Sequence, residues 1–218
     1  LLQNKLKIEK GFAFDINAAC TGFVYAMDIA DKYIKSGSVK NALVVGTEKI
    51  TSLLDWKDRN TCVLFGDGAG AVVLSASEKP GILSNTIGSN GSYKDLLTVN
   101  TDPEYIEMKG NDVFKIAVNT MGKLAISTLK ENNMNIDQVD WLIPHQANSR
   151  IINAIAKKIS LPNDKVIMTV DKHGNTSAAS IPLALDDANK KGLLRKNHVI
   201  MFEAFGAGFT WGSTLLKF

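Results

Sequence analysis

The stretch FDINAACTGFVYAMDIADKYIKSG, residues 14–37, recurs in altered form near the other end of the chain. The later stretch TVDKHGNTSAASIPLALDDANKKG, residues 169–192, aligns with it without a gap and places Asn175 on Cys20. In each stretch a strand-like run leads into small residues, and then into an apolar helical pattern that ends at a glycine. We therefore predict that the chain contains two copies of one α/β unit.

Helical patterns and strand-like runs alternate along the chain, which predicts a largely parallel sheet with helices on both faces. The polar residues 89–112 are expected to form a long loop. The predicted helices cover residues 21–36, 111–132, 148–159 and 176–191. The predicted strands cover residues 12–18, 41–48, 62–68, 70–76, 81–84, 140–145, 165–171, 198–206 and 209–218.

The repeat divides the chain into a first half, residues 1–80, and a second half, residues 81–218. The second half has two strands and two helices ahead of its copy of the repeat, whereas the first half has only residues 1–11 in that place. We therefore expect the N-terminal portion of the first unit to be missing from this sequence, as in the later part of a longer protein.

The composition indicates a globular protein that binds neither membranes nor nucleic acids. The 218 residues are 45% hydrophobic and 22% charged, and the formal net charge is +3. We find no apolar run of the roughly 20 residues that a membrane helix needs. A net charge of +3 is too small to indicate a nucleic-acid partner. The two cysteines are too few for a disulfide framework, which favours a cytoplasmic location.

Neither a metal site nor a dinucleotide site is expected. The three histidines are scattered without metal-ligand spacing. The run GDGAGA, residues 66–71, fits a dinucleotide-binding fingerprint, but strand-like residues follow it where a helix should begin. We interpret it as a glycine-bearing hairpin.

Cys20 stands where a predicted strand gives way to a long apolar helix. A thiol at a helix N-terminus is exposed to the helix dipole and to free N–H groups, which favour the nucleophilic thiolate. The same N–H groups can stabilise an oxyanion. The alternative is that Cys20 is a small buried hydrophobic residue, and this is how we interpret Cys62.

His145 and Asn175 stand at comparable joints. His145 ends a predicted strand and precedes a helix, where it could donate a hydrogen bond, exchange a proton or simply satisfy the helix start. Asn175 could act as a neutral hydrogen-bond donor or as a helix cap. Together, the three joints offer a nucleophile, an imidazole and an amide, and the repeat would set Cys20 opposite Asn175. We expect His173 to support its loop.

Four motifs, AACTGF, PHQANSRI, HGNTSAASIP and EAFGAGFTWGS, resemble in order and spacing those of the β-ketoacyl-acyl-carrier-protein synthase III family. The resemblance extends over essentially the whole chain. It implies the thiolase-like fold, a duplicated α/β unit with mixed sheets covered by helices, in a cytoplasmic homodimer. It also implies a condensing acyltransferase that starts type II fatty acid synthesis from an acyl-CoA, such as acetyl-CoA, and malonyl-acyl-carrier protein.

The resemblance implies roles for individual residues. Cys20 would carry the acyl group, and His145 and Asn175 would stabilise the enolate formed by decarboxylation. Coenzyme A enters as the thioester substrate, and no separate cofactor or metal is implied.

Other positions are carried over from the same family. The resemblance places Arg59 and Asn148 at coenzyme A, Gln146 and Arg150 at the carrier protein, Phe205 and Ala207 at the oxyanion site, and Ile50 and Phe65 at the acyl pocket. Ala207 stands where the family often has glycine, a change that keeps the backbone N–H.

Three other functions remain possible. The chain could be another thiolase-fold synthase of specialised metabolism, or a non-catalytic fragment that binds acyl-CoA. A papain-type hydrolase also uses Cys, His and Asn. That class needs a CGSCW context around the cysteine, which the chain does not have.

Overall fold

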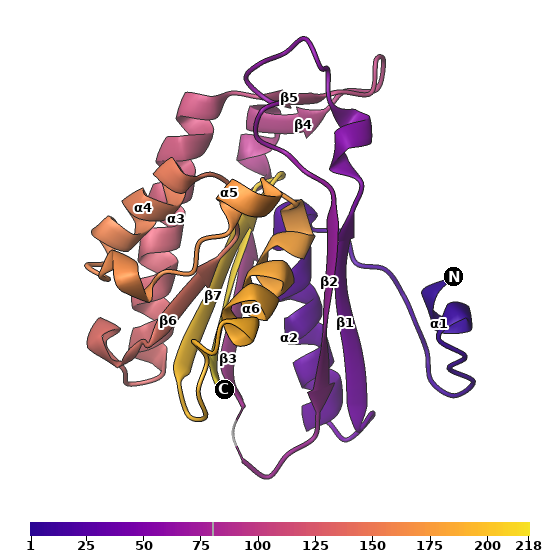
Figure 1. Ribbon diagram of the computed structural model, residues 1–218, viewed down its shortest axis with the longest axis vertical. Helices are drawn as coiled ribbons and strands as arrows, with labels where there is room; N and C mark the ends of the chain where they lie inside the picture. The colour runs from indigo at the N-terminus through magenta and orange to yellow at the C-terminus, as the bar shows by residue number, and fades with distance from the viewer. Residues whose placement is uncertain (80) are drawn as a thin grey trace.

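The computed structural model describes residues 1–79 and 81–218 and is drawn in Figure 1. The helices of this part are α1 (Leu2–Lys5), α2 (Gly22–Lys35), α3 (Gly110–Glu131), α4 (Ser149–Lys158), α5 (Val170–His173) and α6 (Ser180–Lys190). The strands are β1 (Asn41–Glu48), β2 (Gly68–Ser75), β3 (Ile82–Ser89), β4 (Leu97–Val99), β5 (Ile106–Met108), β6 (Trp141–Pro144), β7 (Val199–Gly206) and β8 (Thr210–Lys217). The boundary proposed between the two halves, at residue 80, touches a residue outside the described part.

The main sheet has four strands in the order β3-β8-β7-β6. Only β6 and β7 run parallel, whereas β3, β8 and β7 pair antiparallel. A second antiparallel pair joins β1 to β2. The prediction of a largely parallel sheet was therefore wrong. The strands that follow helices α2 and α6, β1 and β7, each pair antiparallel with the next strand, β2 and β8. The mixed sheets expected from the family resemblance are confirmed, because the main sheet combines parallel and antiparallel pairs.

The helices and sheets stack in layers because each buries an apolar face against its neighbour. Helices α2 and α6 lie between the main sheet and the β1–β2 pair (Figure 1), and the side chains between them form one core cluster that includes Phe23, Val24, Ile181 and Phe202. Helices α3 and α4 lie on the other side of the main sheet. The prediction that helices cover both faces of the sheet is therefore confirmed. Full burial of an aliphatic or phenylalanine side chain stabilises a fold by about 1.5–3 kcal/mol, so these clusters dominate the packing energy.

The central helices were predicted within a few residues. Both end as expected, because Gly37 and Gly192 adopt left-handed backbone angles, with φ of 76° and 68°. Their first residues, however, do not correspond in the alignment of the two repeats. A 3-10 turn precedes each helix, η1 (Ala19–Thr21) before α2 and η6 (Ser177–Ala179) before α6. Helix α2 has 14 residues and α6 has 11, so the helix starts are shifted relative to the ungapped alignment.

Three of the predicted strands, residues 12–18, 62–68 and 165–171, are not strands in the structure. Residues 12–18 pair with no strand of the described chain, and a strand needs such a neighbour for its backbone hydrogen bonds. Residues 62–68 begin in a turn held by Asp58, whose backbone oxygen accepts the N–H of Cys62 at 3.0 Å. In residues 165–171 the N–H of Thr169 is bound by a glutamine side chain, and helix α5 follows at once.

Two further regions matter for later sections. The predicted loop 89–112 contains a 3-10 turn and the short β4–β5 pair instead of irregular chain alone. Helix α1 stands apart from the packed layers (Figure 1). In the described part of the chain, no helix combines the length and the apolar character needed to span a membrane.

Candidate active site

Cys20 lies in η1, at the joint between the segment 12–18 and helix α2, and is 7% exposed. The end of strand β7 packs directly against it. A side chain added at Gly206 would come within 2.8 Å of the Cys20 nitrogen and 3.1 Å of the Thr21 nitrogen. Only a glycine permits this approach, which brings the FGAG turn beside the thiol.

Burial controls the protonation of the Cys20 thiol. It raises the pKa of Cys20 to about 11, against a hydrogen bond from the Ser177 side chain, while the negative charge of Glu48 adds to the rise. Loss of solvent thus opposes the thiolate that the helix start was expected to favour. The resting group is a neutral thiol.

His145 follows strand β6 and is 3% exposed. Its Nδ1 lies 2.8 Å from the Ser180 hydroxyl, at the start of α6, and its ring meets the Phe205 ring edge to face at 5.7 Å. Burial lowers the pKa of His145 to about 4, and a hydrogen bond with the Ser177 backbone opposes this only in part. The imidazole is therefore neutral at physiological pH, and its Nδ1 is engaged by Ser180.

Asn175 is held by hydrogen bonds of its backbone and of its side-chain oxygen. Its N–H donates to the Leu64 oxygen at 2.8 Å, and its own oxygen accepts the N–H of Gly66 at 2.9 Å. Its Oδ1 accepts the Ser177 N–H at 2.9 Å, which leaves Nδ2 to donate to a bound molecule. Gly174 precedes it with φ of 66°, and a side chain there would lie 3.0 Å from the Leu64 oxygen.

Ser177 is the common neighbour of the three predicted residues. Its N–H donates to the Asn175 side chain at 2.9 Å, and its side chain and backbone lie near enough to Cys20 and to the His145 ring to influence their pKa values. Residues from η1, β6 and the loop after α5 thus meet at the 3-10 turn η6, although they lie far apart in the sequence. The arrangement places one nucleophile beside two neutral hydrogen-bond donors, as an acyl-transfer or decarboxylation site requires.

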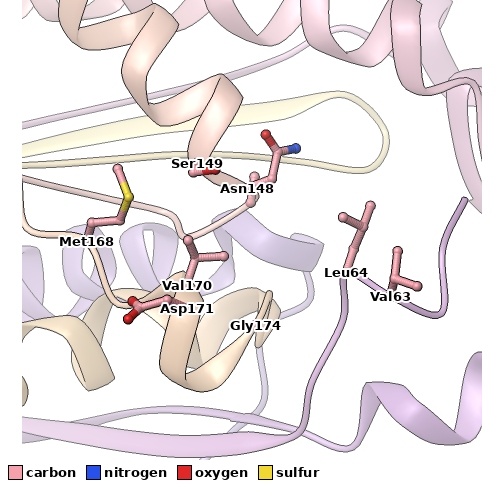
Figure 2. A pocket seen from close by; sticks show the side chains of 9 residues that line it. Val63, Leu64, Asn148, Ser149, Met168, Val170, Asp171 and Gly174 are labelled. Carbon is pink, nitrogen blue, oxygen red and sulfur yellow. The ribbon is translucent and has the colours of Figure 1, made fainter.

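A groove of about 540 Å³ opens next to these loops (Figure 2). Val63 and Leu64 line one side and Val170 and Asp171 of α5 another, while Asn148 stands at the start of α4. The amide oxygen of Asn148 accepts the Ile151 N–H at 2.9 Å, so it also caps α4. The groove is therefore mostly apolar, with an amide at its rim, which suits an extended arm of mixed polarity.

The remaining predicted residues are spread around the site. Arg59 is exposed in the turn that follows Asp58, and Ile50 and Phe65 are partly buried. Phe65 pairs with Asn175 through an isolated bridge, which places it beside the catalytic loop. Ala207 is partly buried in the turn between β7 and β8.

Gln146 and Arg150 differ sharply in exposure. Gln146 is 1% exposed, and its amide bonds three backbone groups, of Pro144, Ile167 and Thr169. A direct contact with a carrier protein does not fit this position, because the side chain has no surface to offer. Arg150 is exposed and lies over the Phe114 ring, with its guanidinium carbon 5.9 Å from the ring centre.

Three polar residues of the site were missed by the sequence predictions: Glu48, Ser177 and Ser180. The two serines lie within HGNTSAAS, but nothing in their spacing shows which distant side chains they meet. Glu48 ends a strand in the other half of the chain, and only the packing of β1 on η6 brings it close. Among residues 1–79 and 81–218, no group of three or more His, Cys, Asp and Glu side chains could hold a metal ion.

Comparison with known families gives two matches along the chain. Residues 14–91 match the family described as 3-oxoacyl-[acyl-carrier-protein (ACP)] synthase III, and residues 129–218 match the C-terminal part of the same synthase. The two matched segments contain all three residues that meet around η6.

Individual relatives agree with these matches. The chain is 55% identical to the β-ketoacyl-[acyl-carrier-protein] synthase III of Thioalkalivibrio sulfidiphilus, over 100% of the chain and 71% of that protein. The crystal structure of the 3-oxoacyl-[acyl-carrier-protein] synthase III of Aquifex aeolicus superposes with a TM-score of 0.97 at 49% identity. The Pseudomonas aeruginosa enzyme gives 0.96 at 40% identity. Both structures are covered to 70%, and this chain to 100%.

Proposed function

This chain belongs to the 3-oxoacyl-acyl-carrier-protein synthase III family and is a condensing acyltransferase of fatty acid synthesis, and we propose how its residues divide the reaction. The substrates are a short acyl-CoA, typically acetyl-CoA, and malonyl-acyl-carrier protein. The products are 3-oxoacyl-carrier protein, CO2 and coenzyme A. No metal or separate cofactor takes part, and the enzyme works as a homodimer in the cytoplasm.

In the first half-reaction Cys20 attacks the thioester carbonyl of acyl-CoA. The oxygen becomes an anion, which the backbone N–H groups of Cys20 and Ala207 stabilise. The close approach of Gly206 to the Cys20 nitrogen supports this pairing. The coenzyme A sulfur leaves and takes up the proton that the Cys20 thiol gives up, and the acyl group stays on the Cys20 sulfur. Ile50, Phe65 and Phe205 line the pocket that holds its hydrocarbon end.

In the second half-reaction malonyl-carrier protein loses CO2 beside the acyl-enzyme. Nε2 of His145 and Nδ2 of Asn175 donate hydrogen bonds to the thioester oxygen of the malonyl group, where the enolate charge develops. A neutral His145 can donate from Nε2 when the Ser180 hydroxyl, which already accepts the Gln146 N–H at 3.3 Å, donates to Nδ1. The enolate carbon attacks the acyl carbonyl and releases the Cys20 thiolate.

Two surface features serve the carriers of the acyl groups. The groove beside Asn148 takes the pantetheine arm, and exposed Arg59 contacts the nucleotide end of coenzyme A. Arg150, supported by the ring of Phe114, meets the acidic carrier protein. Gln146 holds the loop after β6 in place and makes no contact with the carrier. Residues 1–80 and 81–218 form the two thiolase-like halves, which contribute the nucleophile and the two donors respectively.

The observation that carries this proposal is that Cys20, His145 and Asn175 meet around the turn η6: η1 packs on η6, His145 bonds Ser180, and Asn175 bonds Ser177. The test is to incubate the full-length protein with acetyl-CoA alone and to locate the product by intact mass and peptide mapping. We expect one acetyl group on Cys20, none after Cys20→Ala, and unchanged labelling after Cys62→Ala. A folded protein that forms no adduct, or one that only releases acetate, would contradict the proposal.

A further inference from the structure

A partly buried carboxylate reaches the turn that holds Asn175, and neither half-reaction above uses it. Glu48 ends strand β1, and its Oε1 accepts the Ser177 hydroxyl at 3.1 Å and the Ala178 N–H at 3.3 Å. Ser177 in turn donates its backbone N–H to Oδ1 of Asn175 at 2.9 Å. Hydrogen bonds therefore connect Glu48, through Ser177, to the amide of Asn175.

Ser177 has a backbone conformation that needs outside support. Its φ of 49° is left-handed, which is uncommon for a residue other than glycine and persists only where the surroundings hold it. Within the described chain, the side chain of Thr176, which directly precedes η6, makes no capping hydrogen bond to the turn. Oxygens of Asn175 and Glu48 instead accept the first two N–H groups of η6, those of Ser177 and Ala178. Glu48 therefore takes the role of a cap for this turn.

Strand β1 fixes the position of Glu48. Side chains two residues apart on a strand share a face, so Glu48 and Gly46 both face η6. A side chain at Gly46 would come within 2.4 Å of the Ala178 oxygen, which shows how closely the strand approaches the turn. The pairing of β1 with β2 extends to Glu48 itself, which lies opposite Gly68. The carboxylate thus comes from a paired strand, whereas Ser177 lies in a turn that the carboxylate can hold in place.

The conformation of Ser177 decides how the Asn175 amide is held. The Ser177 N–H occupies Oδ1 of Asn175, so Nδ2 remains to donate to the malonyl thioester. We propose that Glu48 is a positioning residue for decarboxylation, because it holds Ser177 in the conformation that fixes the Asn175 amide, an inference that rests on the proposed function. Without the carboxylate, Ser177 relaxes toward ordinary helical angles and its N–H leaves Oδ1. Fewer molecules then hold Nδ2 ready to donate, and the rate of decarboxylation falls with that fraction.

Two other roles for Glu48 predict different results in the two half-reactions. A residue that only stabilised the fold would affect both half-reactions alike. The negative charge of Glu48 raises the pKa of Cys20, so a residue that acted by charge alone would slow acyl transfer, and a neutral replacement would speed that step. A positioning residue for Asn175 changes decarboxylation alone, since the proposed acyl transfer uses Cys20 and the N–H groups of Cys20 and Ala207.

The experiment measures the two half-reactions separately in the full-length enzyme. Release of CO2 from malonyl-carrier protein is followed in a Cys20→Ala parent, and release of coenzyme A from acetyl-CoA in the wild-type parent. Glu48→Gln and Glu48→Met have side chains of similar length, but only Gln keeps an oxygen that can accept both hydrogen bonds. Because Glu48→Met loses two hydrogen bonds to a charged group, we expect it to slow decarboxylation by about 100-fold and to leave coenzyme A release within about threefold. Glu48→Gln should stay within about fivefold of its parent in both steps, since a neutral acceptor binds less strongly than a charged one.

Two further variants test the route through Ser177 and Asn175. Asn175→Ala combined with Glu48→Met should decarboxylate no more slowly than Asn175→Ala alone, because Glu48 acts through that amide. Ser177→Ala removes only the bond between the hydroxyl and Glu48, so it should slow decarboxylation by about tenfold and leave coenzyme A release unchanged. This variant keeps the test decisive if Glu48→Met does not fold.

The matched control removes a side-chain acceptor from a different 3-10 turn. Asn135 accepts the Asp137 N–H at 3.1 Å at the start of η4 (Ile136–Gln138). This turn precedes β6, whereas His145 follows that strand. Asn135→Ala should therefore keep both rates of its parent.

The outcomes separate the inference from the function on which it rests. Full decarboxylation in a folded Glu48→Met protein overturns the inference, and so does an equal loss of both half-reactions in Glu48→Met or Ser177→Ala. Glu48→Gln as slow in decarboxylation as Glu48→Met also overturns it, because the charge and not the hydrogen bonds would then be needed. A folded Cys20→Ala parent that releases no CO2 overturns the proposed function itself, before any change is made at Glu48.

Discussion

At the scale of single residues, solvent exclusion decides the charge of each group in the site. Cys20 and His145 are both almost fully buried, and burial moves their pKa values in opposite directions, to about 11 and about 4. Each group is therefore neutral at pH 7. The positions of Cys20, His145 and Asn175 at strand–helix joints could be predicted from the sequence. Their protonation could not, since it depends on how completely distant segments cover them.

The alkylation of Cys20 by iodoacetamide tests the state of the thiol. Only the thiolate reacts, so with a pKa of about 11 the rate should rise about tenfold per pH unit between pH 7 and 9. The measurement uses a Cys62→Ala background, because Cys62 is a second, partly exposed thiol. A rate that levels off by pH 8 would show that the dipole of the helix start prevails after all.

The protonation of His145 can be followed directly. We expect its ring to titrate at about pH 4 in side-chain NMR spectra, with the signal assigned through His145→Gln. Because the unfolded chain binds this proton first, the free energy of unfolding should fall as pH drops from 6.5 toward 4, by up to about 1.4 kcal/mol per unit. A midpoint near 6.5 would contradict the burial of the ring.

At the scale of elements, the two 3-10 turns η1 and η6 make the site. Ala19 and Ser177 open these turns with left-handed backbone angles, at φ of 47° and 49°. Such angles are uncommon for residues other than glycine and must be held by the surrounding packing. The helices could be predicted from apolar spacing. The turns could not, because Ala19 and Ser177 fit an ordinary helical pattern and only contacts from β1 and β7 impose the change.

A substitution at Gly46 should disturb the packing of β1 on η6. In Gly46→Ala the new methyl group would meet the Ala178 oxygen at 2.4 Å, and backbone on both sides prevents an easy adjustment. Overpacking of this kind costs about 1–3 kcal/mol of stability. We expect acyl transfer to fall as well, since η6 must move.

Denaturant unfolding and coenzyme A release, measured on the full-length protein, check this prediction. Gly91→Ala is the control, because a side chain there meets nothing within 4 Å. If Gly46→Ala and Gly91→Ala behave alike, the contact between β1 and η6 does not constrain the site.

At the scale of the whole molecule, layers of helices and sheets stack on one another, and a carboxyl is buried in strand β7 of the main sheet. Glu203 in the middle of β7 is 1% exposed, and neither of its carboxyl oxygens has a hydrogen-bond partner among the described residues. Burial raises the pKa of Glu203 well above its usual value, which favours the neutral carboxyl in the folded protein. The sequence predicted that helices cover both faces of the sheet. It did not predict the antiparallel pairing, because parallel and antiparallel strands have similar apolar patterns.

Glu203 should make stability depend on pH. The unfolded carboxyl ionises above about pH 4.5 and the folded one only at higher pH, so the free energy of unfolding falls as pH rises from there toward the raised pKa. The slope is up to about 1.4 kcal/mol per pH unit. Denaturant unfolding from pH 4.5 to 7 should show this loss in the wild type and in the exposed control Glu107→Gln. Glu203→Gln should lack it, and an equal slope in all three would refute a buried neutral acid.

The division of labour between the sulfur and the two donors is best tested by decarboxylation of malonyl-carrier protein without any acyl group present. Cys20→Ala in the full-length enzyme should still release CO2, because His145 and Asn175 keep their places on Ser180 and Ser177. Adding His145→Ala or Asn175→Ala to it should lower that rate by about 100- to 1,000-fold each. A Cys20→Ala enzyme that cannot decarboxylate, or double variants as fast as Cys20→Ala alone, would contradict the assignment of the three residues.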